Sequence, residues 1–380
     1  MTPNIDLHER MRLIAARINE GRDSYAGRLD AWHRLGTVSG QFQTAEELLS
    51  AAKANFEVIK LQLEYRGQPV DGYGTFRIDQ FPPKGLEDKA IPFQLKTGET
   101  YYLSFLAPVG SGYQVIQHTD GFELLDRLVG QIGGAHYETM GVLDFGRVVW
   151  AQVNPNFQIR VGEDVSDIYL SYITSHDSSR AHDIYETATR QVCRNTVKIG
   201  YLQKLAATLR IRHTRNAEKR VAALKMEIDE IKNVAMSMQE RLTFLAGRRV
   251  QKESLTTIMN RLFPPTKNDD GVEESSTRRD NILAEILALY EFNDGNAFPE
   301  QRGTAYCLLN SLTNWVDHSR SSKGDGRAES AVFGSGDRLK TTALDLILAE
   351  AEGMPLMPVR GESVSVDWAD LGLNIANTVN

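Results

Sequence analysis

The sequence has few cysteines and no long apolar run. Only Cys193 and Cys307 occur among 380 residues, and neither belongs to a CxxC pair. This excludes a disulfide-stabilised scaffold and a zinc ribbon, and it is typical of a protein of the reducing cytosol. No apolar stretch approaches the roughly 18 residues of a membrane span, and the amino-terminal region is too charged for a signal peptide. We therefore expect a cytoplasmic protein without a membrane-spanning segment.

The sequence also lacks a recognisable nucleotide-binding or catalytic motif. Residues 107–112, APVGSG, have neither the Lys-Ser/Thr of a P-loop nor the third glycine of a dinucleotide fingerprint, so we interpret them as a turn between strands. Cys193 has apolar neighbours in a predicted helix and no pattern that fixes a base, which is typical of a structural thiol. We therefore expect no enzyme activity, no catalytic residues and no cofactor.

Two His-Asp pairs are the remaining candidates for chemistry, His176-Asp177 and His182-Asp183. In a metal-dependent hydrolase such pairs would supply ligands. The two pairs are six positions apart, however, and on a helix such positions point to nearly opposite faces. The preferred interpretation is that His176 and Asp177 end a strand and cap a following helix near Ser178. We predict no metal site, and a hydrolase that uses His176, Asp177 and His182 remains the minor alternative.

Hydrophobic periodicity predicts an α+β fold, with an antiparallel sheet domain before a helical remainder. Thr44-Ala45-Glu46-Glu47 has the form of a capping box and predicts a helix start. Short loops join several of the strands, which favours antiparallel pairing. The expected strands are 56–63, 73–78, 101–106, 113–117, 136–144, 146–153 and 168–174, with a turn at 144–146 and a helix over 119–130. From about residue 180 the pattern predicts helices, including 279–292, 304–318 and 338–352.

This pattern divides the chain into four parts. They are an α+β core domain over 1–200, a long helical segment over 201–263, a polar linker over 264–278 and a helical region over 279–380. The long segment has eight consecutive apolar heptad positions. This seam would pack against its own domain or join subunits, and on the second interpretation we expect a homo-oligomer. The seam consists of Val221, Leu224, Ile228, Ile231, Ala235, Met238, Leu242 and Leu245.

Charge is distributed unevenly along the chain. The net charge is −7, yet residues 190–220 carry +8, so the rest carries −15. Arginine and lysine side chains at helical intervals would neutralise phosphates, and Tyr169, Tyr172, Tyr185 and Tyr201 would stack on unpaired bases. The alternative is a solvated helix face that pairs with the acidic remainder of the chain in a neighbouring subunit. The candidate nucleic-acid-binding residues are Arg190, Arg194, Lys198, Lys204, Arg210, Arg212, Arg215 and Lys219.

Two blocks of sequence resemble a known family. The block Thr174-Ser175-His176-Asp177-Ser178-Ser179, followed by residues 190–196, RQVCRNT, is similar to the hallmark of the phage/plasmid-like protein family, long carried as a domain of unknown function. Weaker blocks occur at 32–36, 113–117 and 303–318, so the resemblance covers about 30–345. It implies a role on a mobile element and brings no established catalytic residues.

The resemblance and the basic segment together suggest a function. The order of helix, antiparallel strands and basic segment is similar to that of phage single-strand annealing recombinases, a likeness of architecture without a shared motif. We expect a non-catalytic, oligomeric protein that binds and anneals single-stranded DNA, or RNA, in replication or recombination. The alternative is a protein-binding module that inhibits or recruits a host defence or repair factor.

Overall fold

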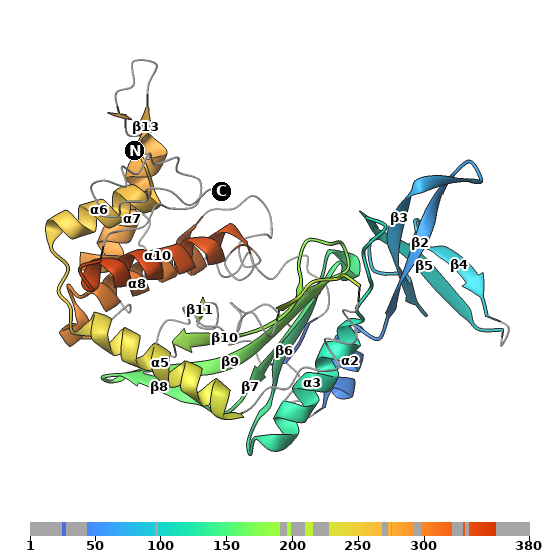
Figure 1. Ribbon diagram of the computed structural model, residues 1–380, viewed down its shortest axis with the longest axis horizontal. Coiled ribbons are helices and arrows are strands. Elements are labelled where there is room, and N and C mark those ends of the chain that lie inside the picture. Colours follow the sequence, from blue (N-terminus) through green and yellow to red (C-terminus); the bar gives the residue numbers. More distant parts are fainter. Residues whose placement is uncertain are drawn as a thin grey trace, which may run out of the picture.

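The computed structural model is an α+β protein with two antiparallel sheets and a helical region (Figure 1). It describes residues 25–27, 44–95, 98–190, 196–198, 210–215, 228–267, 273–274, 276–291, 298–320, 330 and 334–354. Strands dominate the first half of these residues and helices the second, so the predicted fold class is confirmed. No helix among the described residues is both long and apolar enough to cross a membrane.

The large sheet is the centre of the molecule. Its strand order is β1-β6-β7-β9-β10-β11; β8 pairs with the first part of β9, and β12 pairs with the start of β10. Its strands are β1 (Tyr25–Gly27), β6 (His136–Leu143), β7 (Val148–Asn154), β8 (Gln158–Val161), β9 (Asp164–Ser175), β10 (His182–Arg190), β11 (Thr196–Lys198) and β12 (Arg210–Ile211).

Helices α2 (Ala45–Ala51) and α3 (His118–Gln131) cover one face of the large sheet (Figure 1). The capping box predicted at Thr44 is present, because the Thr44 hydroxyl accepts from the Glu47 amide and the Glu47 carboxylate accepts from the Thr44 amide. Helix α3 can approach β9 closely because residue 121 is glycine. A Cβ atom at Gly121 would lie only 2.4 Å from the Tyr172 ring.

The small sheet has the order β2-β3-β5-β4 and projects away from the large sheet (Figure 1). Only the part of its inner face nearest the large sheet is buried, with Val58 and Thr75 almost inaccessible. The backbone of Val58 exchanges two hydrogen bonds with the Gln117 side chain, and Arg77 donates to the carbonyl of Phe145. These bonds fix the small sheet to the loops at one end of the large sheet. Its strands are β2 (Glu57–Tyr65), β3 (Gln68–Asp79), β4 (Ile91–Gln94) and β5 (Thr100–Val109).

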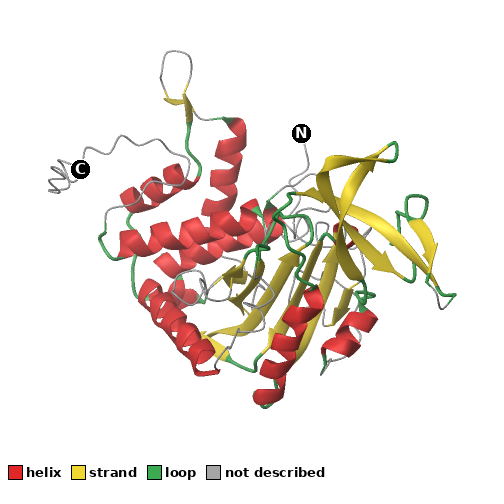
Figure 2. Ribbon diagram, turned by 45° about the vertical axis from the view of Figure 1, so that its right-hand side comes forward, coloured by secondary structure: helices red, strands yellow, loops and turns green. Residues whose placement is uncertain are grey.

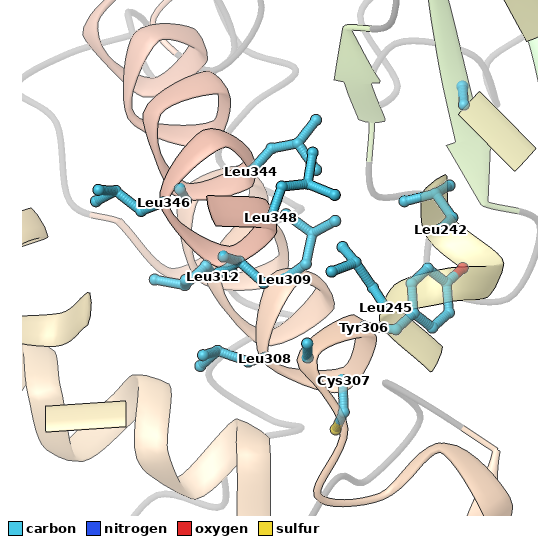
Figure 3. Packing of buried hydrophobic residues seen from close by; sticks show 14 of the residues in the cluster. Leu242, Leu245, Tyr306, Cys307, Leu308, Leu309, Leu312, Leu344, Leu346 and Leu348 are labelled. Atoms are coloured by element: carbon cyan, nitrogen blue, oxygen red, sulfur yellow. The ribbon is translucent and has the colours of Figure 1, made fainter. Parts of the chain in front are cut away.

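The helices of the second half pack together beside the large sheet (Figure 2). They share one apolar cluster with Ile159 and Ile168 of the sheet, and Figure 3 shows its leucines meeting between α5, α8 and α10. A π-helical turn, Trp315–Ser319, extends α8, and a short hairpin of β13 (Thr266–Lys267) and β14 (Glu273–Glu274) lies within the predicted polar linker. The helices are α5 (Ile228–Ala246), α6 (Lys252–Leu262), α7 (Thr277–Glu291), α8 (Ala305–Asn314) and α10 (Ser335–Ala351), and a 3-10 turn spans Pro299–Gln301.

The heptad seam is occupied within the chain. Its described members on α5 have at most 5% of their surface exposed, and they belong to the two cores of the same molecule. The Gln239 side chain also accepts a 2.8 Å hydrogen bond from the Arg160 amide of β8. The first of the two interpretations, packing against its own domain, therefore describes this helix. The buried members are Ile231, Ala235, Met238, Leu242 and Leu245, whereas Val221 and Leu224 lie outside the described residues.

Most predicted elements are present, with two corrections. Residues 113–117 form no strand; this irregular segment is held by a hydrogen bond from the Gln114 amide to the His213 carbonyl. The chain does not become helical at residue 180, because 182–190 forms β10 and pairs with β9 along nearly its whole length. The turn expected at 144–146 is confirmed, with positive φ at Asp144 and Phe145. The strand over 146–153 and the helix over 338–352 are also confirmed, within two or three residues.

Candidate nucleic-acid interface

The hairpin between β9 and β10 carries the first block of the family resemblance. Asp177 caps the turn itself: its carboxylate accepts a 2.9 Å bond from the Ser179 amide, and Ser178 adopts a positive φ of 66°. The hydroxyl of Ser175 closes the hairpin by accepting from the Arg180 amide and lying 3.2 Å from its carbonyl. The expectation that His176 and Asp177 cap a helix near Ser178 is therefore wrong, because the chain reverses here into β10.

Four histidines gather beneath this hairpin, although they are distant in the sequence. His176 directly follows β9 and His182 begins β10. His118 begins α3, and His213 follows β12. All four are buried. The large sheet brings them together because β9, β10 and β12 are neighbours and α3 packs across β9.

The hydrogen bonds define the protonation of two of these rings. Nε2 of His118 lies 2.8 Å from the carbonyl of Ala54, so it carries the proton. Nδ1 of His118 is then the acceptor for Nε2 of His176, 3.3 Å away. This assignment makes Nδ1 of His176 an acceptor, and it has no hydrogen-bond partner among the described residues. His213 is held in the same way, with Nδ1 3.1 Å from the carbonyl of Gln114 and its ring stacked on Tyr113.

Burial keeps this histidine cluster neutral. It lowers the pKa of His118 to about 4 and that of His182 to about 3, and it lowers the pKa values of His176 and His213 as well. The nearby imidazoles add to the effect at His176 and His182, because a second positive charge would be repelled. Within the described residues, no group of three or more His, Cys, Asp or Glu side chains is arranged to hold a metal ion. The cluster supports the hairpin rather than presenting an accessible acid or base.

The described parts of the basic segment form β11 and β12, which pair with β10. β12 places Arg210 opposite Asp183, and β11 places Lys198 opposite Thr187, so both strands lie on the side of β10 away from β9. The predicted helical arrangement is therefore wrong for the described part of the segment. Arg190 ends β10 opposite Ser166, seven residues along the strand from Asp183, so it does not lie beside Arg210. Arg194, Lys204 and Lys219 lie outside the described residues.

Arg212 and Arg215 are exposed beside the hairpin. They follow β12 on either side of the buried His213, which anchors this segment. Neither guanidinium forms an ion pair with another described residue, unlike the buried pair Lys340 and Asp317 elsewhere in the molecule. We call the hairpin turn, residues 177–181, together with residues 210–215 the basic hairpin edge. It contains Arg180 as a fourth arginine beside Arg210, Arg212 and Arg215, and the basic segment of the sequence did not include it.

The aromatic part of the sequence prediction is wrong for the described residues. Tyr169, Tyr172 and Tyr185 have at most 3% of their surface exposed, so their rings are not available to stack on bases. The Tyr172 hydroxyl instead donates a 3.0 Å bond to the carbonyl of His118 and lies 3.4 Å from Nδ1 of His182. Tyr201 lies outside the described residues.

These features define an α+β protein in which a neutral histidine cluster supports a basic sheet edge. The family model described as a domain of unknown function, DUF932, matches residues 105–335, and the chain belongs to this family. The match includes the hairpin, all four histidines and the basic segment, but begins after most of the small sheet. Neither the curated proteins nor the solved structures contain a match to this chain.

Proposed function

We propose that this protein binds single-stranded nucleic acid along the basic hairpin edge. The observation that carries the proposal is the pair of exposed guanidiniums, Arg212 and Arg215, held beside the hairpin without ion pairs to described residues. Side chains of this kind neutralise phosphates and release counterions, which gives affinity independent of sequence. Binding of this kind uses positive charge and needs no hydrolysis of a nucleotide.

The biological part of the proposal rests on the resemblance to phage and plasmid proteins. In it, the protein acts in the cytoplasm on single strands of a mobile element and promotes their annealing during replication or recombination. The rigid support of the edge fits this role, because a charged surface attached to a sheet and a buried cluster keeps its geometry when a strand binds. DNA is the preferred ligand, and RNA is compared with it in the same assay.

A salt series tests the binding directly. Anisotropy of a labelled oligothymidine is measured with the wild type and with the double variant Arg212→Gln/Arg215→Gln. Both side chains are exposed, so the variant should fold normally. It should bind more weakly at low salt, and the slope of log affinity against log salt should fall by about 0.7 for each phosphate that the protein no longer neutralises.

A matched variant separates local charge from net charge. The double variant Lys252→Gln/Arg338→Gln also removes two positive charges, but from exposed positions on α6 and α10. The proposal predicts near wild-type affinity for this control. No binding by the wild type at low salt, or equal losses in both double variants, would contradict it. The basic hairpin edge would then be better explained as a docking face for an acidic protein, as in the alternative function.

A further inference from the structure

The outer face of the small sheet is apolar and exposed. Residues paired across β2, β3, β5 and β4 share this face by their register, for example Ile59 with Phe76, and Leu103 with Ile91. Ring contacts confirm the arrangement, since Phe76 and Phe105 are 5.3 Å apart and Phe93 and Tyr101 are 6.1 Å apart. The face comprises Ile59, Leu61, Leu63, Phe76, Ile78, Ile91, Phe93, Tyr101, Leu103 and Phe105.

None of these ten side chains is fully buried, and three are exposed to solvent. Ile91 has 60% of its surface exposed, Phe105 45% and Leu61 39%. Part of the opposite face, around Thr75, is buried against the body of the molecule, whereas Gln62 farther along that face is exposed. A sheet with one apolar face in water is expected to cover that face with a partner.

The size of the face is that of an interaction surface. One residue on a sheet face occupies about 32 Å², so ten residues give about 320 Å² of flat area. This is in the range, roughly 300–600 Å², of the largest and often functional patches on monomers. Tyr65, which ends β2, and Phe81, which follows β3 in the chain, are also exposed, and each can bury on the order of 150 Å² if it joins the contact. The sum reaches roughly 600 Å² per partner, the lower bound for a stable interface.

Charge identifies the partner. Residues 57–109 contain six basic and seven acidic side chains, a net charge of −1; the ten apolar face positions include none, and the exposed Glu57, opposite Ile78, lies at the end of β2 on this face. Such a surface offers nothing to a strongly acidic or basic partner, and it does not repel a copy of itself. A two-fold axis brings identical patches together, and a predominantly apolar sheet face is complementary to itself in the aligned packing of a β-sandwich.

We propose that two copies of this chain associate through the outer face of the small sheet. The dimer forms without nucleic acid and leaves the basic hairpin edge, which lies on the large sheet, outside the interface. It provides the assembly contact that the heptad seam, buried within its own chain, does not provide.

Sedimentation velocity of the full chain without nucleic acid, from about 1 to 50 µM, tests the proposal. The wild type should sediment as a dimer of the 42.5 kDa chain. The double variant Ile91→Lys/Phe105→Lys should be monomeric, with a dissociation constant raised at least about 100-fold, because charge is placed in the centre of the contact. Met236→Lys is the control, since Met236 is equally exposed at 60% but lies on α5; it should remain dimeric.

Two further measurements keep the test decisive. Circular dichroism should show unchanged thermal unfolding of the double variant; if it fails to fold, the single variant Leu61→Gln replaces it. A photoreactive crosslinker on Ile91→Cys should give products of twice the chain mass. The proposal would be overturned by a monomeric wild type or by a double variant that still dimerises. It would also be overturned if Ile91→Cys crosslinked only to another segment of the same chain, or only to a different protein.

Discussion

The seam of α5 and the outer face of the small sheet are both regular apolar surfaces, but they differ in what covers them. Five seam residues are at most 5% exposed, because four of them lie in the cluster that α8 and α10 share with β8, and Ile231 lies in the core of the large sheet. On the small sheet, Ile91 and Phe105 are about half exposed. A periodic pattern in the sequence thus identifies an apolar surface without identifying its partner. The heptad pattern of α5 is compatible with a subunit interface, but its residues form part of the core. The exposed apolar face is formed by the strands of the small sheet.

The largest effect is expected from the buried ion pair within the helical region, between α10 and the π-helical turn after α8. Nζ of Lys340 lies 2.7 Å from the Asp317 carboxylate, and both side chains are at most 3% exposed. Lys340→Met should lower the free energy of unfolding by about 3–5 kcal/mol, because it leaves a buried charge without its counterion. Chemical denaturation checks this, and the neighbouring exposed change Arg338→Gln should cost almost nothing. A loss below about 1 kcal/mol for Lys340→Met would contradict the buried pair.

The second test compares two apolar residues of α5 that face opposite ways. Leu245 is fully buried, whereas Met236 is 60% exposed. Leu245→Ala should lower the free energy of unfolding by about 2–5 kcal/mol, and Met236→Ala should change it by less than about 0.5 kcal/mol. Neither change should alter the oligomeric state of the folded protein. If Leu245→Ala instead separated subunits without loss of stability, the seam would be an interface and the comparison would fail.

The histidine cluster predicts a loss of stability in acid. Its folded-state pKa values, about 4 for His118 and about 3 for His182, lie below the ordinary value of 6.5. The unfolded chain therefore takes up more protons, and stability should fall as the pH drops from about 6.5 toward 4, by about 1.4 kcal/mol per pH unit for each histidine. Replacing His182 with glutamine should reduce the slope of stability against pH by about 1.4 kcal/mol per pH unit, the contribution of one histidine. Thermal unfolding between about pH 7.5 and 4.5 measures it; a stability that rises on acidification would contradict the buried neutral state.

The smallest effect is expected on the exposed sheet face. Leu61→Ala should change the stability of the isolated chain by less than about 0.5 kcal/mol, because Leu61 remains 39% exposed after folding. Chemical denaturation at low protein concentration, where a dimer would have dissociated, measures the free energy of unfolding of the monomer alone. A loss comparable to that of Leu245→Ala would show that the face is covered within one chain.

The sequence contained the local signals of the fold but not its long-range contacts. The Thr44 capping box and the turn at Asp144 were predictable because their residues are adjacent in the chain. The sequence pattern does not predict β10, although Tyr185, Thr187 and Thr189 are typical strand residues, because the positive charges that follow favour a helix face.

The site was only partly predictable for the same reason. Arg212 and Arg215 could be chosen from charge alone, and they are exposed where the proposal needs them. The histidine cluster could not, because His118 and His176 are 58 residues apart and meet only through the packing of α3 on β9. No spacing rule along the sequence describes such a contact.

Locating the bound strand tests the proposed nucleic-acid interface itself. A single-stranded DNA carrying photoreactive thymidines is crosslinked to the wild-type protein, and the modified peptides are identified by mass spectrometry. Binding along the basic hairpin edge predicts crosslinks within residues 177–181 and 210–215, and their disappearance in Arg212→Gln/Arg215→Gln. Crosslinks confined to the small sheet or to helices α6 and α10, unchanged in that variant, would contradict it.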